Sequence, residues 1–318
     1  MKEQHLNFCK NTEGVSIFMQ PWFLDAVCGS DRWGVCMDIA KNGDVNGVMI
    51  YHFVDKWGFK ILKMPTLMGH MDIWLNNDDT WKTEHRTSFE KTVLKNLIAQ
   101  LPKTDFSLQM YPATLQNWLP FWWAGYHIEP MMNYVIEDLA DMPSIWKNLK
   151  DTTRKKIRKA QKAGFKVEIR DDIDAFYSIL KQTVNRIGFK TGITKSILYQ
   201  LHEEIQRRNA GKIFFVMDET GDIHAAFYII WNMEKAIYWI ATMNKKTGNS
   251  GATRLLLWEV LQELSQRGIP RFEAMGSMLE NLEPFISTFG AKQETYWKMT
   301  RYSNGFFALL HALKKYLG

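Results

Sequence analysis

A glycine-containing loop in the last third of the sequence has the composition of a phosphate-binding segment. The loop covers residues 244–253, and it contains Gly248 and Gly251 after Lys245. Glycine lets a backbone approach a ligand with no Cβ in the way, and residues 252–267 are expected to form a helix directly afterwards. The free amides at a helix N-terminus suit a pyrophosphate. A loop of this kind is also common without any ligand, and that alternative stays open.

The basic side chains are concentrated in one segment. Residues 154–166 carry seven basic side chains and no acidic one. The chain as a whole has 40 Lys and Arg against 34 Asp and Glu, a formal net charge of +6, so the remainder sums to about −1. A single basic segment on a nearly neutral body favours a local anionic ligand over general nucleic-acid binding. A solvated helix face, a phosphate-bearing ligand, and a polynucleotide or membrane surface all remain open.

Three side chains near the loop could take part in proton transfer or substrate orientation. Glu273 is expected at the end of a buried strand, where desolvation would suit a general base; it could equally form an ion pair or cap a helix. Tyr238 lies on a predicted strand and could act as a general acid or simply pack. Ser277 could orient substrate or serve as a helix N-cap. No Ser/His/Asp or Cys/His arrangement indicates a covalent nucleophile.

The composition bounds the class of protein. A chain of 318 residues, 46% apolar and 14% aromatic, has enough apolar material for two domains or one large core and excludes disorder. No segment approaches the roughly 20 apolar residues of a membrane helix, and the first ten residues lack the apolar region of a signal peptide. Three cysteines without a CxxC motif predict neither disulfides nor a metal site. These features together predict a reduced, soluble, cytoplasmic protein.

The order of predicted elements repeats. In the first half we expect strands at 33–39, 46–54, 60–64 and 106–111, and helices following Pro21 and over 83–101. A strand at 134–138 then begins a second series, with a helix over 144–163 that Ser144 caps. This series continues with a strand at 165–170, helices at 173–187 and 195–209, and strands at 213–217, 224–231 and 237–243. The boundary between two domains is therefore placed at residues 133 and 134.

Four motifs resemble those of a known superfamily. They are TRKKIRKAQKAG (153–164), GATRLLLWE (251–259), RFEAMGSM (271–278) and FISTFGA (285–291). The sequence resembles the GNAT-superfamily acyltransferases, in the tandem-domain branch related to the Fem-type peptidoglycan aminoacyltransferases. The likeness is specific over about 145–170 and 212–298.

The resemblance implies an α+β fold of two tandem GNAT-like domains, 1–133 and 134–318, with mixed, mostly antiparallel sheets flanked by helices. Residues 300–318 would pack back on the first domain. Two strands would part in the middle of the second sheet and admit acetyl-CoA or another acyl-CoA, whose pantetheine arm would pair with strand 237–243. The implied donor-binding residues are Met243, Asn244, Lys245, Gly248, Ser250, Gly251, Ala252 and Thr253. No metal is implied.

The resemblance also implies the reaction, in which an acceptor amine attacks the donor carbonyl directly. The expected activity is transfer of an acyl group to an amine of a sugar or cell-envelope precursor, with Glu273, Tyr238 and Ser277 as the catalytic candidates. The expected acceptor-binding residues, which would hold a nucleotide-sugar or lipid-linked diphosphate, are Arg154, Lys155, Arg158, Lys159 and Trp22.

Two alternatives are kept. The first is an aminoacyl-tRNA-dependent transferase acting on a peptidoglycan precursor, in which the basic helix would contact tRNA phosphates. The second is a degenerate fold retained for binding or scaffolding. It rests on Ile286, which stands where many members of the superfamily have a tyrosine acid.

Overall fold

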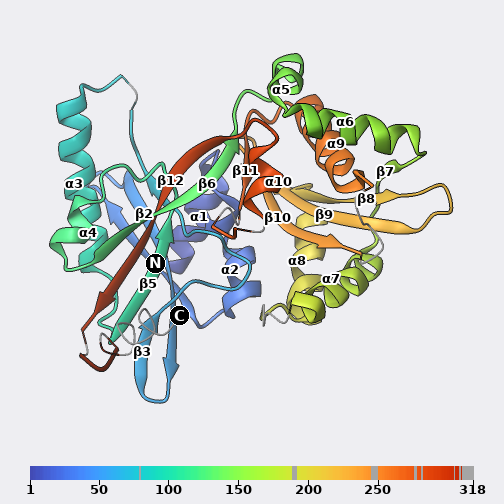
Figure 1. The fold of residues 1–318 in the computed structure, drawn as a ribbon. Coiled ribbons are helices and arrows are strands. Elements are labelled where there is room, and N and C mark those ends of the chain that lie inside the picture. The colour runs from blue at the N-terminus through green and yellow to red at the C-terminus, as the bar shows by residue number, and fades with distance from the viewer. Residues whose placement is uncertain are drawn as a thin grey trace. The chain divides into compact units, whose positions relative to one another are not determined.

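The chain divides into two compact units. The structure is a computed structural model that describes residues 1–78, 80–187, 192–244, 250–275, 278–280, 282–303, 305–307 and 309 (Figure 1). Unit 1 consists of Met1–Met131 and Thr295–Gly318, and unit 2 of Met132–Glu294. The sequence placed the boundary at 133 and 134, with residues 300–318 packing back; the chain passes between the units at Met131 and again at Glu294.

Unit 1 is built on a mostly antiparallel sheet. Its strand order is β1-β2-β3-β5-β12, and β4 pairs separately with β2. The strands are β1 (Trp33–Ile39), β2 (Val45–Lys56), β3 (Phe59–Leu62), β4 (Ile73–Leu75), β5 (Phe106–Tyr111) and the part of β12 (Lys292–Tyr302) from Thr295. The helices are α1 (Lys2–Asn11), α2 (Pro21–Cys28), α3 (Thr83–Ala99) and α4 (Leu119–Trp123), with a 3₁₀ turn, η1, over Ile17–Met19. Pro21 opens α2, as its fixed φ favours at a first helical position.

Unit 2 is a sheet with helices on both faces. Its strand order is β6-β11-β10-β9-β8-β7, and only β10 and β11 are parallel. The strands are β6 (His127–Ile136) from Met132, β7 (Lys166–Ile169), β8 (Gly211–Met217), β9 (Ile223–Trp231), β10 (Ala236–Met243) and β11 (Phe272–Ala274). The helices are α5 (Met142–Asn148), α6 (Asp151–Lys162), α7 (Ile173–Ile187), α8 (Lys195–Arg207), α9 (Ala252–Gln266) and α10 (Glu283–Ser287).

The helices of unit 2 explain why its central strands are mostly apolar. Figure 1 shows α6 and α9 on one side of β8–β10, and α7 and α8 on the other. Residues 225–231 of β9 are all buried, because strands covered on both faces have no solvent side that would favour polar residues. The helix α9 contributes a buried apolar stripe that includes Leu256, Val260 and Leu264. The expected class, α+β with mixed, mostly antiparallel sheets, is confirmed.

The strand β10 has different partners along its length. On one side it pairs with β9 from Ala236 to Met243, with a register shift between Tyr238 and Ile240. On the other side it pairs with β11 only through Ala236 and Ile237. A bulge bends and twists a strand, so the chain turns away from β11 where the pairing stops. Within the part of the sheet that the structure describes, β10 beyond Ile237 therefore has a partner on one edge only.

The predicted helix over 144–163 is wrong, because two helices occupy this stretch. α5 ends at Asn148 and α6 starts at Asp151, with Leu149 between them in an extended conformation (φ −59°, ψ 140°). Leu149 is buried and the Lys150 amide donates to the Thr288 carbonyl at 3.0 Å, and these contacts favour a break over a continuous helix. Ser144 is not the cap. Its amide donates to the Asp141 carboxylate, which caps α5.

The described helices contain no segment of the length and apolar character needed to cross a membrane.

Candidate active site

The start of α9 packs against α6. The end of the glycine-containing loop therefore lies beside the basic segment that the sequence analysis identified. Gly251 precedes α9 with φ +86°, and a Cβ built on it would lie 2.4 Å from the Lys156 carbonyl oxygen. Both its left-handed conformation and this close approach require glycine. The sequence assigned the glycine to closeness with a ligand, whereas the structure shows closeness to the backbone of α6.

Three cations gather at this junction. They are Lys156 and Lys159 of α6 and Arg254 in the first turn of α9. The charge of Arg254 lowers the pKa of the Lys156 ammonium, and partial burial and the charge of Lys159 lower it further. Like charges held together in this way repel one another, and an anion placed among them removes the repulsion. We call Lys156, Lys159 and Arg254 the cation cluster.

Arg254 is the most informative member of the cation cluster. Its Nε is buried and has no hydrogen-bond partner in the part of the chain that the structure describes. Burial lowers the pKa of the guanidinium, and the group lies 5.7 Å from the centre of the Phe285 ring. A cation in the first turn of a helix also opposes the helix dipole. Unpaired charge at an unfavourable position favours ligand binding over a structural role.

The predicted basic residues of α6 divide into two groups. Arg154 is engaged inside the protein, since Nη1 donates to the carbonyls of Trp146 (3.0 Å) and Lys147 (2.6 Å) and the side chain pairs with Asp151. Arg158 lies over the Trp146 ring at 5.6 Å. The remaining two, Lys155 and Lys159, are exposed on the same helix, and no described residue pairs with them.

The predicted donor-binding residues also differ in availability. Thr183 Oγ1 donates to the Met243 carbonyl (3.2 Å) and accepts from its amide (3.3 Å), and Asn244 continues the pairing with β9 through His224 and Ile223. Lys245 and Gly248 lie outside the described residues. Ser250 Oγ accepts from the Ala252 amide at 3.2 Å. Ala252 and Thr253 form the first turn of α9 beside the cation cluster.

Tyr238 lies where β10 and β11 part, one residue beyond the last pair, Ile237 with Glu273. Its ring packs edge-on against Phe227 at 4.8 Å and lies 6.1 Å from Phe272. Burial raises the pKa of its hydroxyl far above the usual value, so the group keeps its proton at neutral pH. Tyr238 can therefore donate a proton or a hydrogen bond but cannot serve as a base.

Glu273 is held in ion pairs on the opposite face of β11. Both carboxylate oxygens lie 3.3 Å from Lys235 Nζ, and one lies 3.2 Å from Arg271 Nε. Only 4% of Glu273 is exposed. Because Phe272 faces Tyr238 and neighbouring strand residues point to opposite faces, the structure does not bring Glu273 and Tyr238 together. Ser277, the third catalytic candidate, lies outside the described residues.

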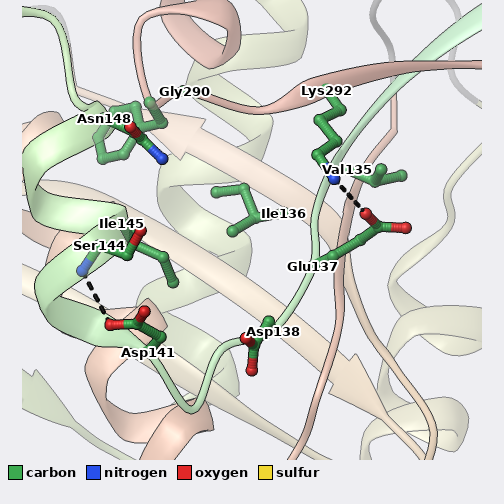
Figure 2. A pocket seen from close by; sticks show the side chains of 11 residues that line it. Val135, Ile136, Glu137, Asp138, Asp141, Ser144, Ile145, Asn148, Gly290 and Lys292 are labelled. Atoms are coloured by element: carbon green, nitrogen blue, oxygen red, sulfur yellow. Dashed lines mark hydrogen bonds and ion pairs between the residues drawn. The ribbon is translucent and has the colours of Figure 1, made fainter.

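Trp22 belongs to unit 1, where it lies in the first turn of α2 with its ring edge-on to Phe23 at 5.7 Å. Unit 2 also has a pocket of about 260 Å³ that contains none of the predicted site residues (Figure 2). Three of its charged groups are engaged, since Lys292 Nζ pairs with Glu137 at 2.8 Å and Asp141 caps α5. This pocket therefore does not add to the candidate site.

The three cysteines belong to unit 1, whereas the candidate site lies in unit 2. Burial raises the pKa of Cys9, Cys28 and Cys36 to about 12 each, so their thiols stay protonated. No cluster of three or more His, Cys, Asp or Glu suitable for a metal ion occurs among the described residues. The arrangement instead offers cations for phosphate, a parted strand pair for an extended ligand, and a protonated phenol.

Comparisons with known proteins show what the chain is similar to. Residues 147–285, which lie within unit 2, match the family model of the acetyltransferase (GNAT) domain. No curated protein matches the sequence. Among solved structures, the chain is similar to FemX, with a TM-score of 0.69 and 12% identity over 98% of both chains.

Two further structures show the same architecture. One is the C-terminal domain of a protein described as a lysylphosphatidylglycerol synthetase from Agrobacterium fabrum, with a TM-score of 0.60 and 12% identity over 98% of this chain and 94% of that one. The other is a tandem GNAT protein from the clavulanic acid biosynthesis pathway, with a TM-score of 0.51 and 9% identity over 94% and 93%.

The chain thus has the Fem-like tandem GNAT fold that its motifs predicted. Residues 147–285 of unit 2 match the GNAT acetyltransferase domain, and this match supports an acyltransferase activity.

Proposed function

We propose that the protein transfers an acyl group from acyl-CoA to an amine of a sugar or cell-envelope precursor. The observation that carries this proposal is the cation cluster of Lys156, Lys159 and Arg254, which lies at the N-terminus of α9. Its unpaired charges and the first amides of α9 suit the diphosphate of the donor. The donor-binding residues we propose are therefore the cluster together with Gly251, Ala252 and Thr253.

The parted strands provide the place for the reaction. The acceptor nitrogen attacks the thioester carbonyl, an N–C bond forms, and the C–S bond breaks. The leaving sulfur needs a proton as the amine loses one. Tyr238, which burial keeps protonated at the point where β10 and β11 part, is the proposed proton donor. Glu273, paired with two cations, is proposed as a structural residue.

Aminoacyl-tRNA is the second candidate donor. The exposed Lys155 extends the positive charge of the cation cluster along α6, and a polynucleotide backbone could follow such a row. The similarity to FemX and to a protein whose name specifies lysyl transfer also supports an aminoacyl donor. The two donors differ in the number of phosphates that the protein neutralises.

The test compares donor binding by the wild type and by two variants of α9. Arg254→Met keeps the packing on Phe285 but removes the charge, and Arg267→Met removes a cation that pairs with Glu263 at the other end of the same helix. We expect Arg254→Met to weaken binding of acetyl-CoA about tenfold or more. We also expect it to leave the melting temperature of the free protein unchanged or raised, because it removes repulsion. Arg267→Met should bind normally.

Calorimetric titration with acetyl-CoA and with uncharged tRNA at several salt concentrations separates the donors. Binding of tRNA would fall steeply with salt, because many phosphates are neutralised, whereas a diphosphate gives a shallow slope. If neither ligand raises the melting temperature of the wild type, the scaffold alternative takes precedence. Normal acetyl-CoA binding by Arg254→Met would remove the cation cluster from the proposal.

A further inference from the structure

A tryptophan stands at the tip of a β-hairpin in unit 1 in a conformation that bulky residues avoid. β2 and β3 are joined by two residues, Trp57 and Gly58, and Lys56 pairs with Phe59 across the hairpin. Both turn residues have positive φ, 56° at Trp57 and 78° at Gly58. A two-residue turn with two positive φ values strongly prefers Asn-Gly, and a bulky side chain at positive φ is a strained exception.

The indole at this turn also gains nothing from burial. Trp57 is 86% exposed, the highest value among the exposed large apolar side chains that the structure describes. Trp57 therefore has a strained backbone conformation and an indole ring exposed to water. Local strain of this kind points to a functional requirement, because folding alone would select asparagine.

The surroundings of Trp57 indicate what the indole contacts. Lys56 Nζ lies 4.5 Å from the centre of the indole ring, and Lys60 is exposed on the returning strand. Phe306, which is 52% exposed, stacks on Phe59 at 6.0 Å. We call Lys56, Trp57, Phe59, Lys60 and Phe306 the tip surface. All five belong to unit 1.

The charge near the tip surface is positive on balance. The hairpin from 55 to 63 contains three lysines and one aspartate. Asp105, whose carboxylate accepts from the Lys60 amide at 2.8 Å, reduces the balance to +1. Indole and lysine at one depth match the interface of a bilayer, where tryptophan rings lie at the headgroup level and lysines reach the phosphates.

The shape of the tip surface favours a membrane over a protein partner. Figure 1 shows the hairpin of β2 and β3 extending from the sheet of unit 1. A narrow projection with one indole cannot supply the roughly 800 Å² per partner of a stable protein interface. It can insert among lipid headgroups without a complementary surface. We infer that the tip surface binds anionic phospholipid membranes, with Trp57 inserted at the headgroup level.

The central variant is Trp57→Asn, because it should weaken membrane binding without lowering the stability of the fold. Asparagine suits the turn, so the melting temperature should stay the same or rise by a few degrees. Binding to vesicles of phosphatidylglycerol and phosphatidylcholine, measured by co-sedimentation, should weaken about tenfold or more, as expected for the loss of one buried aromatic side chain. Acyl transfer to a soluble acceptor should be unaffected.

Trp122→Asn is the matched control, because Trp122 is another exposed indole of unit 1 (59%) and lies on α4. This variant should bind vesicles like the wild type, and pure phosphatidylcholine vesicles should bind both more weakly. Four results would overturn the inference. They are absence of vesicle binding by the wild type, equal binding by Trp57→Asn, an equal loss in Trp122→Asn, and self-association of the wild type that Trp57→Asn abolishes.

Discussion

Glu273 is buried and Arg254 is half-buried, and these two charged residues of unit 2 differ in pairing. Glu273 has Lys235 and Arg271 within 3.3 Å, whereas the Nε of Arg254 is buried without a partner among the described residues. Removing one partner of a buried ion pair strongly destabilises a protein, because the charge left behind is buried without compensation. This difference in pairing is the reason for proposing a structural role for Glu273 and a ligand-binding role for Arg254.

At the residue scale, we predict that Glu273→Gln mainly affects stability. Loss of the carboxylate charge would leave Lys235 and Arg271 near a neutral group, which should lower the free energy of unfolding by about 2–4 kcal/mol. Urea denaturation measures this loss, and acyl transfer by the folded variant should stay within a few-fold of wild type. A fall in turnover of a hundredfold or more without a loss of stability would instead make Glu273 a catalytic base.

The sequence located the basic helix and the glycine loop but missed how they combine. Nothing in the sequence set Lys156 apart from the six other basic residues of its segment. Arg254 belongs to the motif GATRLLLWE, but the sequence analysis gave it no function. Their proximity depends on the packing of α6 on α9, about a hundred residues apart, which no local pattern reports. One signal was available. Arg254 is a cation in the first turn of a predicted helix, where the dipole disfavours it.

At the scale of elements, periodicity predicted most of the architecture. The strands β1 and β5 were predicted over their observed residues, because apolar side chains alternate and turn residues bound them. The break between α5 and α6 was missed because Leu149 and Lys150 suit a helix by propensity. Burial of Leu149 and the Lys150–Thr288 contact override that propensity.

The junction of α9 with α6 gives a prediction about two glycines. Gly251 and Gly221 have nearly equal φ, +86° and +84°, but a Cβ at Gly251 would approach the Lys156 carbonyl at 2.4 Å while one at Gly221 would meet nothing within 4 Å. Gly221→Ala should cost about 1 kcal/mol from backbone strain alone. Gly251→Ala should cost about 3 kcal/mol, because the clash adds to the strain. Equal losses in urea denaturation would contradict the close packing of α6 and α9.

For the whole molecule, the main feature is that unit 1 is discontinuous in sequence. Unit 2 is one continuous stretch, Met132–Glu294, whereas unit 1 is completed by Thr295–Gly318. Trp297 to Tyr302 of β12 pair with Tyr111 to Phe106 of β5. The sequence suggested the return of the last residues from the resemblance alone, because composition does not change at either crossing.

We predict that the two units differ in independence. A fragment of residues 132–294 should unfold cooperatively on heating, because all the strand pairs from β7 to β11 lie within it. A fragment of residues 1–131 should not, because β5 loses its β12 partner and exposes a strand edge. Circular dichroism melts measure the unfolding of both fragments. Joining residues 295–318 to the fragment of residues 1–131 by a short linker should restore cooperative unfolding. Cooperative unfolding of residues 1–131 alone would contradict this.

The edge of β10 that β11 leaves after Ile237 has an evolutionary consequence. Hydrogen bonds from a strand edge recognise the amide groups of an extended ligand and do not depend on the rest of that ligand. A protein that binds its donor in this way can change the acyl group that it transfers without a change in the strand. Selection for a different transferred group would then act on the surrounding aromatic side chains and leave the strand unchanged. Examples are Phe227, which packs against Tyr238, and Phe285, which packs against Phe227.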